Sequence, residues 1–360
     1  MGARMDEALA RVLAHGQFIL GPEVKELEGK LAAFSGVRHC ISCANGTDAL
    51  LLPLMAWSIG PGDAVIVPSF TFVASAEVVV LAGATPVFVD VDRASFNMTA
   101  EALELGILAA RESGLAPRVA MPVDLFGQPV DFAGLERMCQ KYRLKILSDA
   151  AQSYGGAQGN RRVGSLAPAT STSFFPSKPL GTYGDGGAIF TDDDGLNDLL
   201  RSIRMHGQGI DKYQNARIGL NSRLDTMQAA ILLQKLEILE DEIAARDRIA
   251  RRYSEALADV CEVPRVASGN SSAWAQYTIL IENRDGVAKA LDAAGIPTAI
   301  YYPIPLHRQK GYRHFPVAKG ELGVSEELAR LVLSLPMHPY LEPADQDRVI
   351  AAVRRAAPRA

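Results

Sequence analysis

One lysine stands in a sequence context that suggests chemistry rather than solvation. Lys178 ends the segment Ser173-Phe-Phe-Pro-Ser-Lys178, and a proline and four closely spaced glycines follow it up to Gly187. A lysine amine with a lowered pKa can form an imine with an aldehyde such as pyridoxal 5′-phosphate (PLP). Ser173 could bind the phosphate of such a cofactor, and glycines let a backbone approach a ligand closely. The alternative is a surface lysine in a turn.

A carboxylate precedes this lysine by about thirty residues. Asp149 ends the apolar run Leu144–Asp149, and ligands of open α/β sheets bind beyond the carboxyl ends of the strands. An aspartate there can pair with the protonated pyridine nitrogen of PLP and keep the ring an electron sink. As an isolated feature, Asp149 is better explained as the N-cap of a helix. Asp149 and Lys178 together favour a cofactor site.

Two further segments fit the same chemistry. Asn45-Gly46-Thr47 opens an apolar helical run, and the N-terminus of a helix binds phosphate through free N–H groups. The same residues also suit an ordinary turn and cap. Phe70 and Phe72 follow an expected strand, and one of them could stack on a pyridine ring, although core packing explains both equally well.

The elements around these residues alternate between strand and helix. The expected strands are Ala64–Pro68, Pro86–Asp90, Arg118–Val123, Leu144–Asp149 and Gly187–Thr191. The expected helices between them are Ala74–Leu81, Asp131–Lys141 and Leu196–Met205. Such alternation predicts an α/β fold with a mostly parallel sheet.

The second half of the chain has a different pattern. Residues 223–257 carry apolar side chains at helical spacing and predict one long amphipathic helix or two helices in line. Beyond them, the expected strands are Tyr277–Glu282 and Thr298–Tyr302, and the expected helices are Asp285–Ala294, Ser325–Leu333 and Pro343–Arg355. We therefore predict a large cofactor-binding domain over residues 1–245, with an N-terminal amphipathic helix, and a small α+β domain over residues 246–360.

Composition excludes several classes of function. The 360 residues carry a net charge of −4, which argues against a nucleic-acid partner. No apolar run is long enough for a membrane span, and the first residues lack the apolar core of a secretory signal. Cys40 and Cys43 form a C-x-x-C pair without a second pair or paired histidines, which favours two buried thiols over a metal site. We expect a cytoplasmic protein without a bound metal.

The motifs, taken in order, resemble the sugar-nucleotide aminotransferases of PLP fold type I, the aspartate aminotransferase fold. The resemblance runs from about Phe18 to the C-terminus. It is carried by FILGPEV, ANGTDALLL, PSFTFVA, GATPVFVDVD, SDAAQSYG, SFFPSKPLGTYGDGGAIFT, MHGQG, GLNSRLDTMQAAIL and LPMHPY.

The resemblance implies a role for each matching residue. Lys178 would hold PLP as a Schiff base and act as the catalytic acid and base, and Asp149 would pair with the pyridine nitrogen. The remaining cofactor contacts that it implies are Gly46, Thr47 and Ser173 at the phosphate, Phe72 and Gln152 at the ring, and Asn221 from the neighbouring subunit of a homodimer with shared active sites. Arg223, Tyr301, Tyr302 and His307 would contact the substrate.

The resemblance also implies a reaction. L-glutamate would donate its amino group through PLP, with pyridoxamine 5′-phosphate between the two halves, to a keto sugar nucleotide. The matches favour C3 of a UDP-2-acetamido-2-deoxy-3-oxo-glucuronate, a precursor for surface polysaccharide such as O-antigen. The alternative is a 4-keto-6-deoxy nucleotide sugar. A PLP-dependent dehydratase or a non-catalytic regulator on the same fold is disfavoured because Lys178, Asp149 and Ser173 are all present.

Overall fold

The large domain is built on a seven-stranded sheet. The structure, a computed structural model, describes residues 2–211, 213–320 and 322–357. Its strand order is β1-β9-β8-β5-β4-β2-β3, and only β9 runs antiparallel to its neighbours. The strands are β1 (His39–Cys43), β2 (Asp63–Pro68), β3 (Thr85–Val89), β4 (Ala116–Ala120), β5 (Lys145–Asp149), β8 (Ala169–Ser173) and β9 (Gly187–Thr191). The predicted mostly parallel α/β sheet is confirmed.

Helices cover both faces of this sheet, which explains why its strands read as continuous apolar runs. In β2, Val65 and Val67 pack with the helices of one face, and Ala64 and Ile66 pack with those of the other. The first face carries α3 (Gly46–Ala56), α4 (Ala74–Leu81) and α7 (Asp194–Ile203). The second face carries α5 (Ala100–Glu112) and α6 (Phe132–Tyr142).

Charged side chains cover the free edge of β1, the strand that leads into the Asn45-Gly46 turn. Glu28, on α2 (Pro22–Ser35), accepts hydrogen bonds from the backbone N–H of Ser42 at 3.0 Å and from its hydroxyl at 2.8 Å. Arg204 donates to the carbonyl of Ser42 at 2.6 Å, and Arg201 donates to the carbonyl of Cys40 at 3.3 Å. Glu28 also forms ion pairs with both arginines. An unpaired strand edge invites association, and here side chains replace the missing strand.

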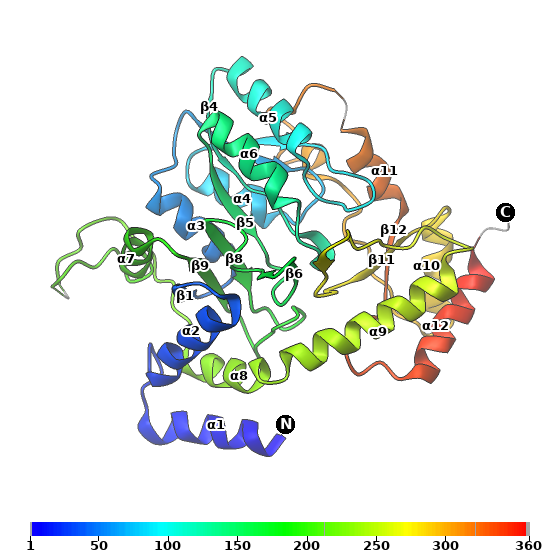
Figure 1. Cartoon of the computed structure of the whole chain (residues 1–360), viewed down its shortest axis with the longest axis horizontal. Helices are drawn as coiled ribbons and strands as arrows, with labels where there is room; N and C mark the ends of the chain where they lie inside the picture. The colour runs from blue at the N-terminus through cyan, green and yellow to red at the C-terminus, as the bar shows by residue number, and fades with distance from the viewer. Residues whose placement is uncertain (1, 212, 321, 358–360) are drawn as a thin grey trace.

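The small domain lies at the C-terminal end of the molecule (Figure 1). It contains the antiparallel pair β11 (Tyr277–Leu280) and β12 (Val332–Leu335) with α10 (Arg284–Ala293), α11 (Gly323–Leu331) and α12 (Pro343–Ala356). The predicted strand at Thr298–Tyr302 is wrong. Only Ala299 makes a β-bridge there, to Ser334, because that segment turns away to form the wall of a cavity described below.

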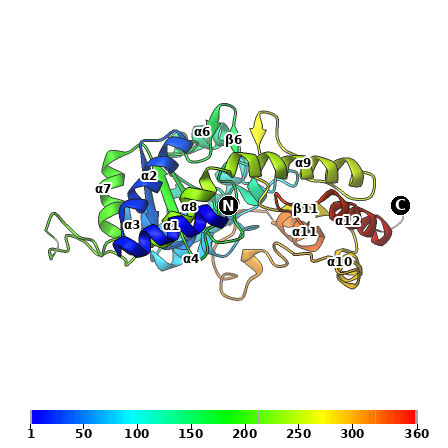
Figure 2. The same ribbon diagram turned by 90° about the horizontal axis from the view of Figure 1, so that it is seen from below.

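Two helices in line join the domains. The predicted helical stretch of residues 223–257 divides into α8 (Thr226–Leu236) and α9 (Leu239–Leu257). Figure 2 shows α9 running from the large domain toward α10 and α12. The predicted division into two domains at residue 245 stays a prediction, and that position lies inside α9. The predicted N-terminal helix is α1 (Gly2–His15), which packs on α8.

The segment between α7 and α8, described over residues 204–211 and 213–225, extends away from the body in both views (Figures 1 and 2). Ile210, Tyr213 and Ile218 in this segment are exposed, with more than four-fifths of each side chain open to solvent in the single chain (111%, 85% and 86%). Large apolar side chains gathered on a projecting segment are typical of a surface that another chain covers.

The smaller elements complete the chain. A three-stranded sheet has the order β10-β6-β7. These strands are β6 (Ala157–Gln158), β7 (Arg161–Arg162) and β10 (Asn270–Ser271), and two short 3₁₀ helices are η1 (Leu125–Gly127) and η2 (Leu306–Arg308). In the described part of the chain, no helix is both long and apolar enough to span a membrane. The cytoplasmic location stays a prediction.

The C-x-x-C pair consists of two free, buried thiols, as predicted. Cys40 and Cys43 lie on β1 three residues apart, so their side chains leave opposite faces of the strand. Cys40 packs with Leu27 and Phe190, whereas Cys43 packs with the cluster on the α3 face. Burial raises the pKa of both thiols, which makes them unreactive.

Candidate active site

The carboxyl ends of the central strands open into a cavity of about 460 Å³. Asp149 ends β5, Ser173 ends β8, and the turn after β1 faces them. Most of the predicted site residues come together here, from segments far apart in the sequence. Those that line the cavity are Gly46, Thr47, Phe72, Asp149, Gln152, Ser173, Lys178, Tyr301 and Tyr302. Asn221, Arg223 and His307 do not line it.

Lys178 reaches the cavity from the loop between β8 and β9. Its backbone N–H donates to the carbonyl of Phe175 at 2.9 Å, which closes a tight turn. Burial lowers the pKa of the Lys178 ammonium, and the nearby Asp149 carboxylate opposes that shift. A lysine in this environment gives up its proton more readily than a solvated one, as a nucleophilic or basic amine must.

The Asp149 carboxylate is almost fully buried, at 5% exposure. Its Oδ2 accepts a hydrogen bond from Ser75 Oγ at 2.8 Å, and its Oδ1 accepts one from the backbone N–H of Ala151 at 3.2 Å. Burial raises the pKa of Asp149, while Ser75, the Ala151 N–H and Lys178 oppose the rise. Two buried groups of opposite charge with opposed pKa shifts in one cavity are typical of an active site.

The N-terminus of α3 packs directly against the end of β8. Asn45 caps the helix by accepting the Asp48 N–H at 2.8 Å, which leaves the first-turn amides of Gly46 and Thr47 pointing out of the helix. A Cβ added at Gly46 would lie 2.6 Å from Ser173 Cβ, so only glycine allows this approach. The Ser173 hydroxyl and the free amides together form a site suited to a phosphate.

Gln152 and two aromatic side chains form another part of the wall. Gln152 Oε1 accepts the Phe126 N–H at 2.7 Å, and its Nε2 donates to Tyr302 Oη at 3.4 Å. The Phe72 ring lines the cavity, with 53% of the residue exposed, and lies 6.0 Å from the Tyr302 ring. Phe70 is buried in the core instead. Phe72 is therefore the phenylalanine placed to meet a bound ring.

His307 holds the wall from behind. Its Nδ1 lies 2.6 Å from Ser69 Oγ, and its Nε2 lies 3.0 Å from Glu326 Oε1. Both ring nitrogens are thus engaged, and these contacts join the segment that carries Tyr301 and Tyr302 to the end of β2 and to α11. In the single chain, His307 supports the wall of the cavity and does not line the cavity itself. Its predicted contact with the substrate stays a prediction.

Asn221 and Arg223 flank Ser222, whose Oγ accepts the Ala44 N–H at 3.2 Å. They sit at the base of the projecting segment, beside the α3 turn but outside the cavity of their own chain. Lys178 is the only lysine or arginine among the described residues that line the cavity. A single chain thus presents no second cation to an anionic substrate.

Three comparisons with known proteins agree with this geometry. Residues 1–354 match the DegT/DnrJ/EryC1/StrS aminotransferase family. The chain belongs to this family. It is 48% identical to the UDP-2-acetamido-2-deoxy-3-oxo-D-glucuronate aminotransferase of Pseudomonas aeruginosa, over 97% of this chain and 95% of that protein.

It is also similar to other members of the family. A UDP-N-acetyl-3-dehydro-α-D-glucosamine 3-aminotransferase from Acidithiobacillus ferrooxidans is 43% identical over 96% of this chain and 92% of that protein. The crystal structure of a family aminotransferase from Brucella abortus superposes with a TM-score of 0.98 at 56% identity, covering 99% of this chain and 96% of that one. The chain is a PLP-dependent sugar aminotransferase, as the motifs predicted.

The donor chemistry of the cavity in this family member fits PLP. The cradle at Gly46, which a Cβ would fill, offers amides and the Ser173 hydroxyl for a phosphate. The buried Asp149 carboxylate suits a protonated ring nitrogen, and the Lys178 amine suits an aldehyde. Phe72 would cover one face of the ring. The individual roles predicted for these residues stay predictions.

The sequence analysis missed several residues that line the site or support it. Thr71, Ser177, Asp185 and Gln276 also line the cavity, and Ser75 lies behind it against Asp149. Thr71 and Ser75 fall in or next to the PSFTFVA segment, which the sequence analysis examined only for its aromatic residues.

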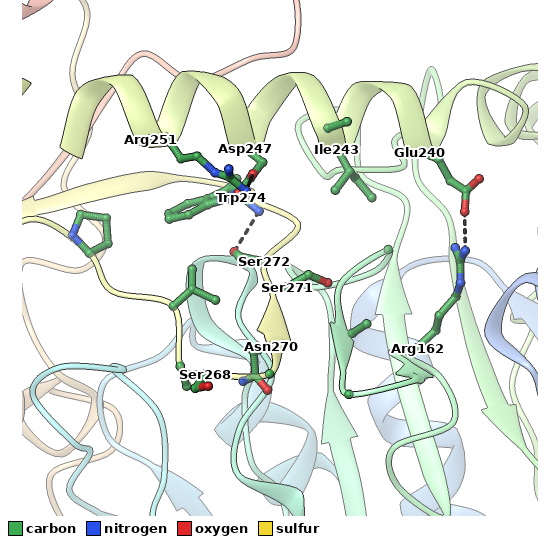
Figure 3. A pocket seen from close by; sticks show the side chains of 18 of the residues that line it. Arg162, Glu240, Ile243, Asp247, Arg251, Ser268, Asn270, Ser271, Ser272 and Trp274 are labelled. Atoms are coloured by element: carbon green, nitrogen blue, oxygen red, sulfur yellow. Dashed lines mark hydrogen bonds and ion pairs between the residues drawn. The ribbon is translucent and has the colours of Figure 1, made fainter. Parts of the chain in front are cut away.

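A second, larger cavity lies elsewhere in this family member. It is an open groove of about 890 Å³ between α9 and residues 266–274 (Figure 3). Four of its charged residues form two ion pairs: Arg162 with Glu240, and Arg251 with Asp247 at 2.6 Å. Asp247 also accepts a hydrogen bond from the Trp274 indole at 3.1 Å. None of the predicted site residues lines this groove.

Proposed function

We propose that this enzyme transfers the amino group of L-glutamate to C3 of UDP-2-acetamido-2-deoxy-3-oxo-D-glucuronate, for surface polysaccharide. The observation that carries the proposal is the buried pair of Lys178 and Asp149 in a cavity that fits PLP. The choice of substrate is supported by the two curated relatives described above, whose names both specify a UDP-linked sugar with a keto group at C3.

Bound PLP supplies an aldehyde that can carry an amino group and a ring that accepts electrons. Lys178 Nζ would be the attachment point, and, once free, would take a proton from the substrate carbon and return it to the other reacting carbon. Asp149 would hold the protonated ring nitrogen. Gly46, Thr47 and Ser173 would fix the phosphate, so that Lys178 meets the same face of the cofactor in both half-reactions.

We further propose a homodimer in which each subunit completes the other's site. The exposed apolar residues of the 204–225 segment support this, because a partner would cover them. Asn221 and Arg223 lie outside their own cavity, so they would serve the partner's site, Asn221 at the phosphate and Arg223 at the substrate. A guanidinium matches a carboxylate or diphosphate in a bidentate manner.

Complementation between two inactive variants tests the shared site. Homodimers of Lys178→Ala and homodimers of Arg223→Ala should each aminate the sugar at only a small fraction of the wild-type rate. Mixed and re-equilibrated subunits should regain about a quarter of the wild-type rate, because half of the dimers are mixed and one of their two sites is intact. A mixture that stays inactive, while native mass spectrometry shows mixed dimers, would place Arg223 in its own subunit's site.

Substrate choice is tested in the reverse direction, with stable 3-amino sugars and 2-oxoglutarate. The enzyme should use the UDP-3-amino uronate with a higher kcat/KM than the matching sugar with a hydroxymethyl group at C6. A 4-amino-6-deoxy nucleotide sugar, the alternative substrate class, should be used least. Arg223→Ala should erase the preference for the uronate and spare the glutamate half-reaction. Preference for the 4-amino sugar would refute the assignment.

A further inference from the structure

Two hydroxyl groups form a short chain behind the Asp149 carboxylate. Ser75 Oγ lies 2.8 Å from Asp149 Oδ2, and Thr71 Oγ1 lies 3.2 Å from Ser75 Oγ. Ser75 is fully buried and Thr71 is 3% exposed. Thr71 also lines the cavity, whereas Ser75 does not. The chain of hydroxyls therefore runs from the cavity wall to the back of the carboxylate.

The direction of these hydrogen bonds follows from the chemistry of the groups. An ionised carboxylate only accepts, so Ser75 must give its single hydroxyl proton to Asp149. Thr71 must then be the donor to Ser75 Oγ. On the other side, the Ala151 N–H donates to Asp149 Oδ1 at 3.2 Å. Each oxygen of Asp149 thus has one fixed donor, and the carboxylate is held from both sides.

The Ser75 hydroxyl does not cap its helix. Ser75 lies in the first turn of α4, two residues after the N-cap position, which is where a capping serine stands. Here Val73 is the N-cap residue, and no side-chain hydrogen bond caps the helix. The partners of the Ser75 hydroxyl are Asp149 and Thr71. A buried hydroxyl committed to a buried carboxylate serves that carboxylate rather than the helix.

The carboxylate needs this support because its surroundings oppose its charge. Burial raises the pKa of Asp149, and the hydrogen bond from Ser75 is the strongest opposing influence. The other groups near Asp149 come from three elements: Lys178 from the loop after β8, Tyr302 from the cavity wall, and Asp124 from the loop after β4. Lys178 favours the charged form, whereas the nearby Asp124 carboxylate disfavours it.

We propose that Ser75, aligned by Thr71, is a positioning residue that keeps the Asp149 carboxylate ionised and aimed at the ring nitrogen of the cofactor. This proposal rests on the proposed placement of Asp149 at that nitrogen. The Ser75 hydroxyl lies outside the cavity, and under this proposal it strengthens binding only of ligands that carry the ring nitrogen. A serine that merely stabilised the fold would affect every ligand of the cavity alike.

The test measures equilibrium binding of two ligands to the cofactor-free enzyme. One is pyridoxamine 5′-phosphate, the amine form of the cofactor, which does not bond covalently to Lys178. The other is its 1-deaza analogue, in which carbon replaces the ring nitrogen. Ser75→Ala should weaken binding of pyridoxamine 5′-phosphate roughly tenfold, the size expected for one lost hydrogen bond to a charged group. Affinity for the deaza analogue should stay within about twofold.

Two variants serve as controls. Ser75→Thr keeps the hydroxyl and should restore most of the difference between the two ligands. Ser148→Ala removes a buried hydroxyl next to Asp149 in the sequence that has no hydrogen-bond partner, and should leave both affinities unchanged. Ser148 thus matches Ser75 in burial and chemistry, but not in contact with the carboxylate.

The outcomes separate this inference from the proposed function. Equal weakening of both ligands by Ser75→Ala, or an equal effect of Ser148→Ala, would overturn the role of Ser75. Failure of the wild-type enzyme to bind pyridoxamine 5′-phosphate would instead overturn the proposed function. If Ser75→Ala does not fold, Thr71→Val decides: a loss of severalfold confined to pyridoxamine 5′-phosphate supports the hydroxyl chain, and an equal loss for both ligands refutes it.

Discussion

Two cavities of this molecule differ in how their charges are arranged. The groove under α9 has about 890 Å³, and four of its charged residues form ion pairs at the surface, with Arg251 75% exposed beside Asp247. The cavity at Lys178 has about 460 Å³, yet it encloses an amine and a carboxylate with opposed pKa shifts. Volume therefore does not identify the active site here. The active site is identified instead by its buried charged side chains. Burying a charge costs desolvation energy, and buried groups with shifted pKa values cluster at functional sites.

The rate of transamination should show the largest difference between the two cavities when Lys178 is replaced in one and Arg251 in the other. Lys178→Ala should lower the rate of transamination by about a hundredfold to ten-thousandfold, because it removes the proposed acid and base. Arg251→Ala in the groove is the matched control and should leave the rate within about twofold of wild type. Rates of the glutamate half-reaction, followed as 2-oxoglutarate release in a single turnover, provide the measurement. A comparable loss in Arg251→Ala would break the distinction.

Neutralising the carboxylate should come next. Asp149→Asn should weaken binding of pyridoxamine 5′-phosphate roughly 10²–10³-fold, because the ring nitrogen would lose its buried counter-charge. The same change at Asp247, which is partly exposed in the groove, should not alter that affinity. Fluorescence titration of the cofactor-free proteins measures both. Unchanged affinity in Asp149→Asn would mean that the ring nitrogen lies elsewhere.

Stability should depend on pH through a carboxyl group beside the smaller cavity. Burial raises the pKa of the Asp124 carboxyl to about 7, well above that of an aspartate in the unfolded chain, so between these two values the folded protein keeps a proton that the unfolded chain has released. The resulting stabilisation is complete below pH 4 and is lost as the pH rises toward 7, by about 3 kcal/mol between these limits. Asp124→Asn should remove this loss from the cofactor-free protein.

The measurement is the difference in free energy of unfolding between Asp124→Asn and wild type as a function of pH. The difference should move in favour of the variant from pH 4 to pH 7. A constant difference for Asp124→Asn would mean that this carboxyl group titrates in the folded state as it does in the unfolded chain.

The groove itself should yield the smallest effect. Arg162 and Glu240 form an ion pair there, with 39% and 66% of their side chains exposed. A double-mutant cycle with Arg162→Ala and Glu240→Ala should give a coupling energy below about 1 kcal/mol, since solvent screens the pair. Transamination should be unaffected. Coupling of several kcal/mol would show that the groove holds its charges as tightly as the Lys178 cavity.

The sequence predicted the elements whose signals are local. Helix Ala74–Leu81 and strand Gly187–Thr191 have the predicted bounds, because each is a short apolar run with glycine close to one end. Strand β8 was missed, since its sequence Ala-Thr-Ser-Thr-Ser lacks bulky apolar residues and is held by its neighbours. The strand expected at Thr298–Tyr302 is wrong for the opposite reason. Its residues favour β-structure, but the segment makes only one β-bridge, from Ala299 to Ser334.

The residues of the candidate site also differ in whether a local sequence signal predicts them. Lys178, Asp149 and Gly46 stand out because short motifs surround them. Ser75 could not be singled out, because its importance lies in a contact with a residue 74 positions away. The groove under α9 was not predicted either, since its walls come from segments near residues 160, 250 and 270. Packing, rather than pattern, brings such residues together.

Reduction of the PLP-loaded enzyme with borohydride, followed by peptide mass mapping, tests the central claim most directly. The account predicts one pyridoxyl adduct, on Lys178, and no adduct on lysines outside the cavity. An adduct on another lysine, or an unmodified Lys178 in a fully loaded enzyme, would contradict it.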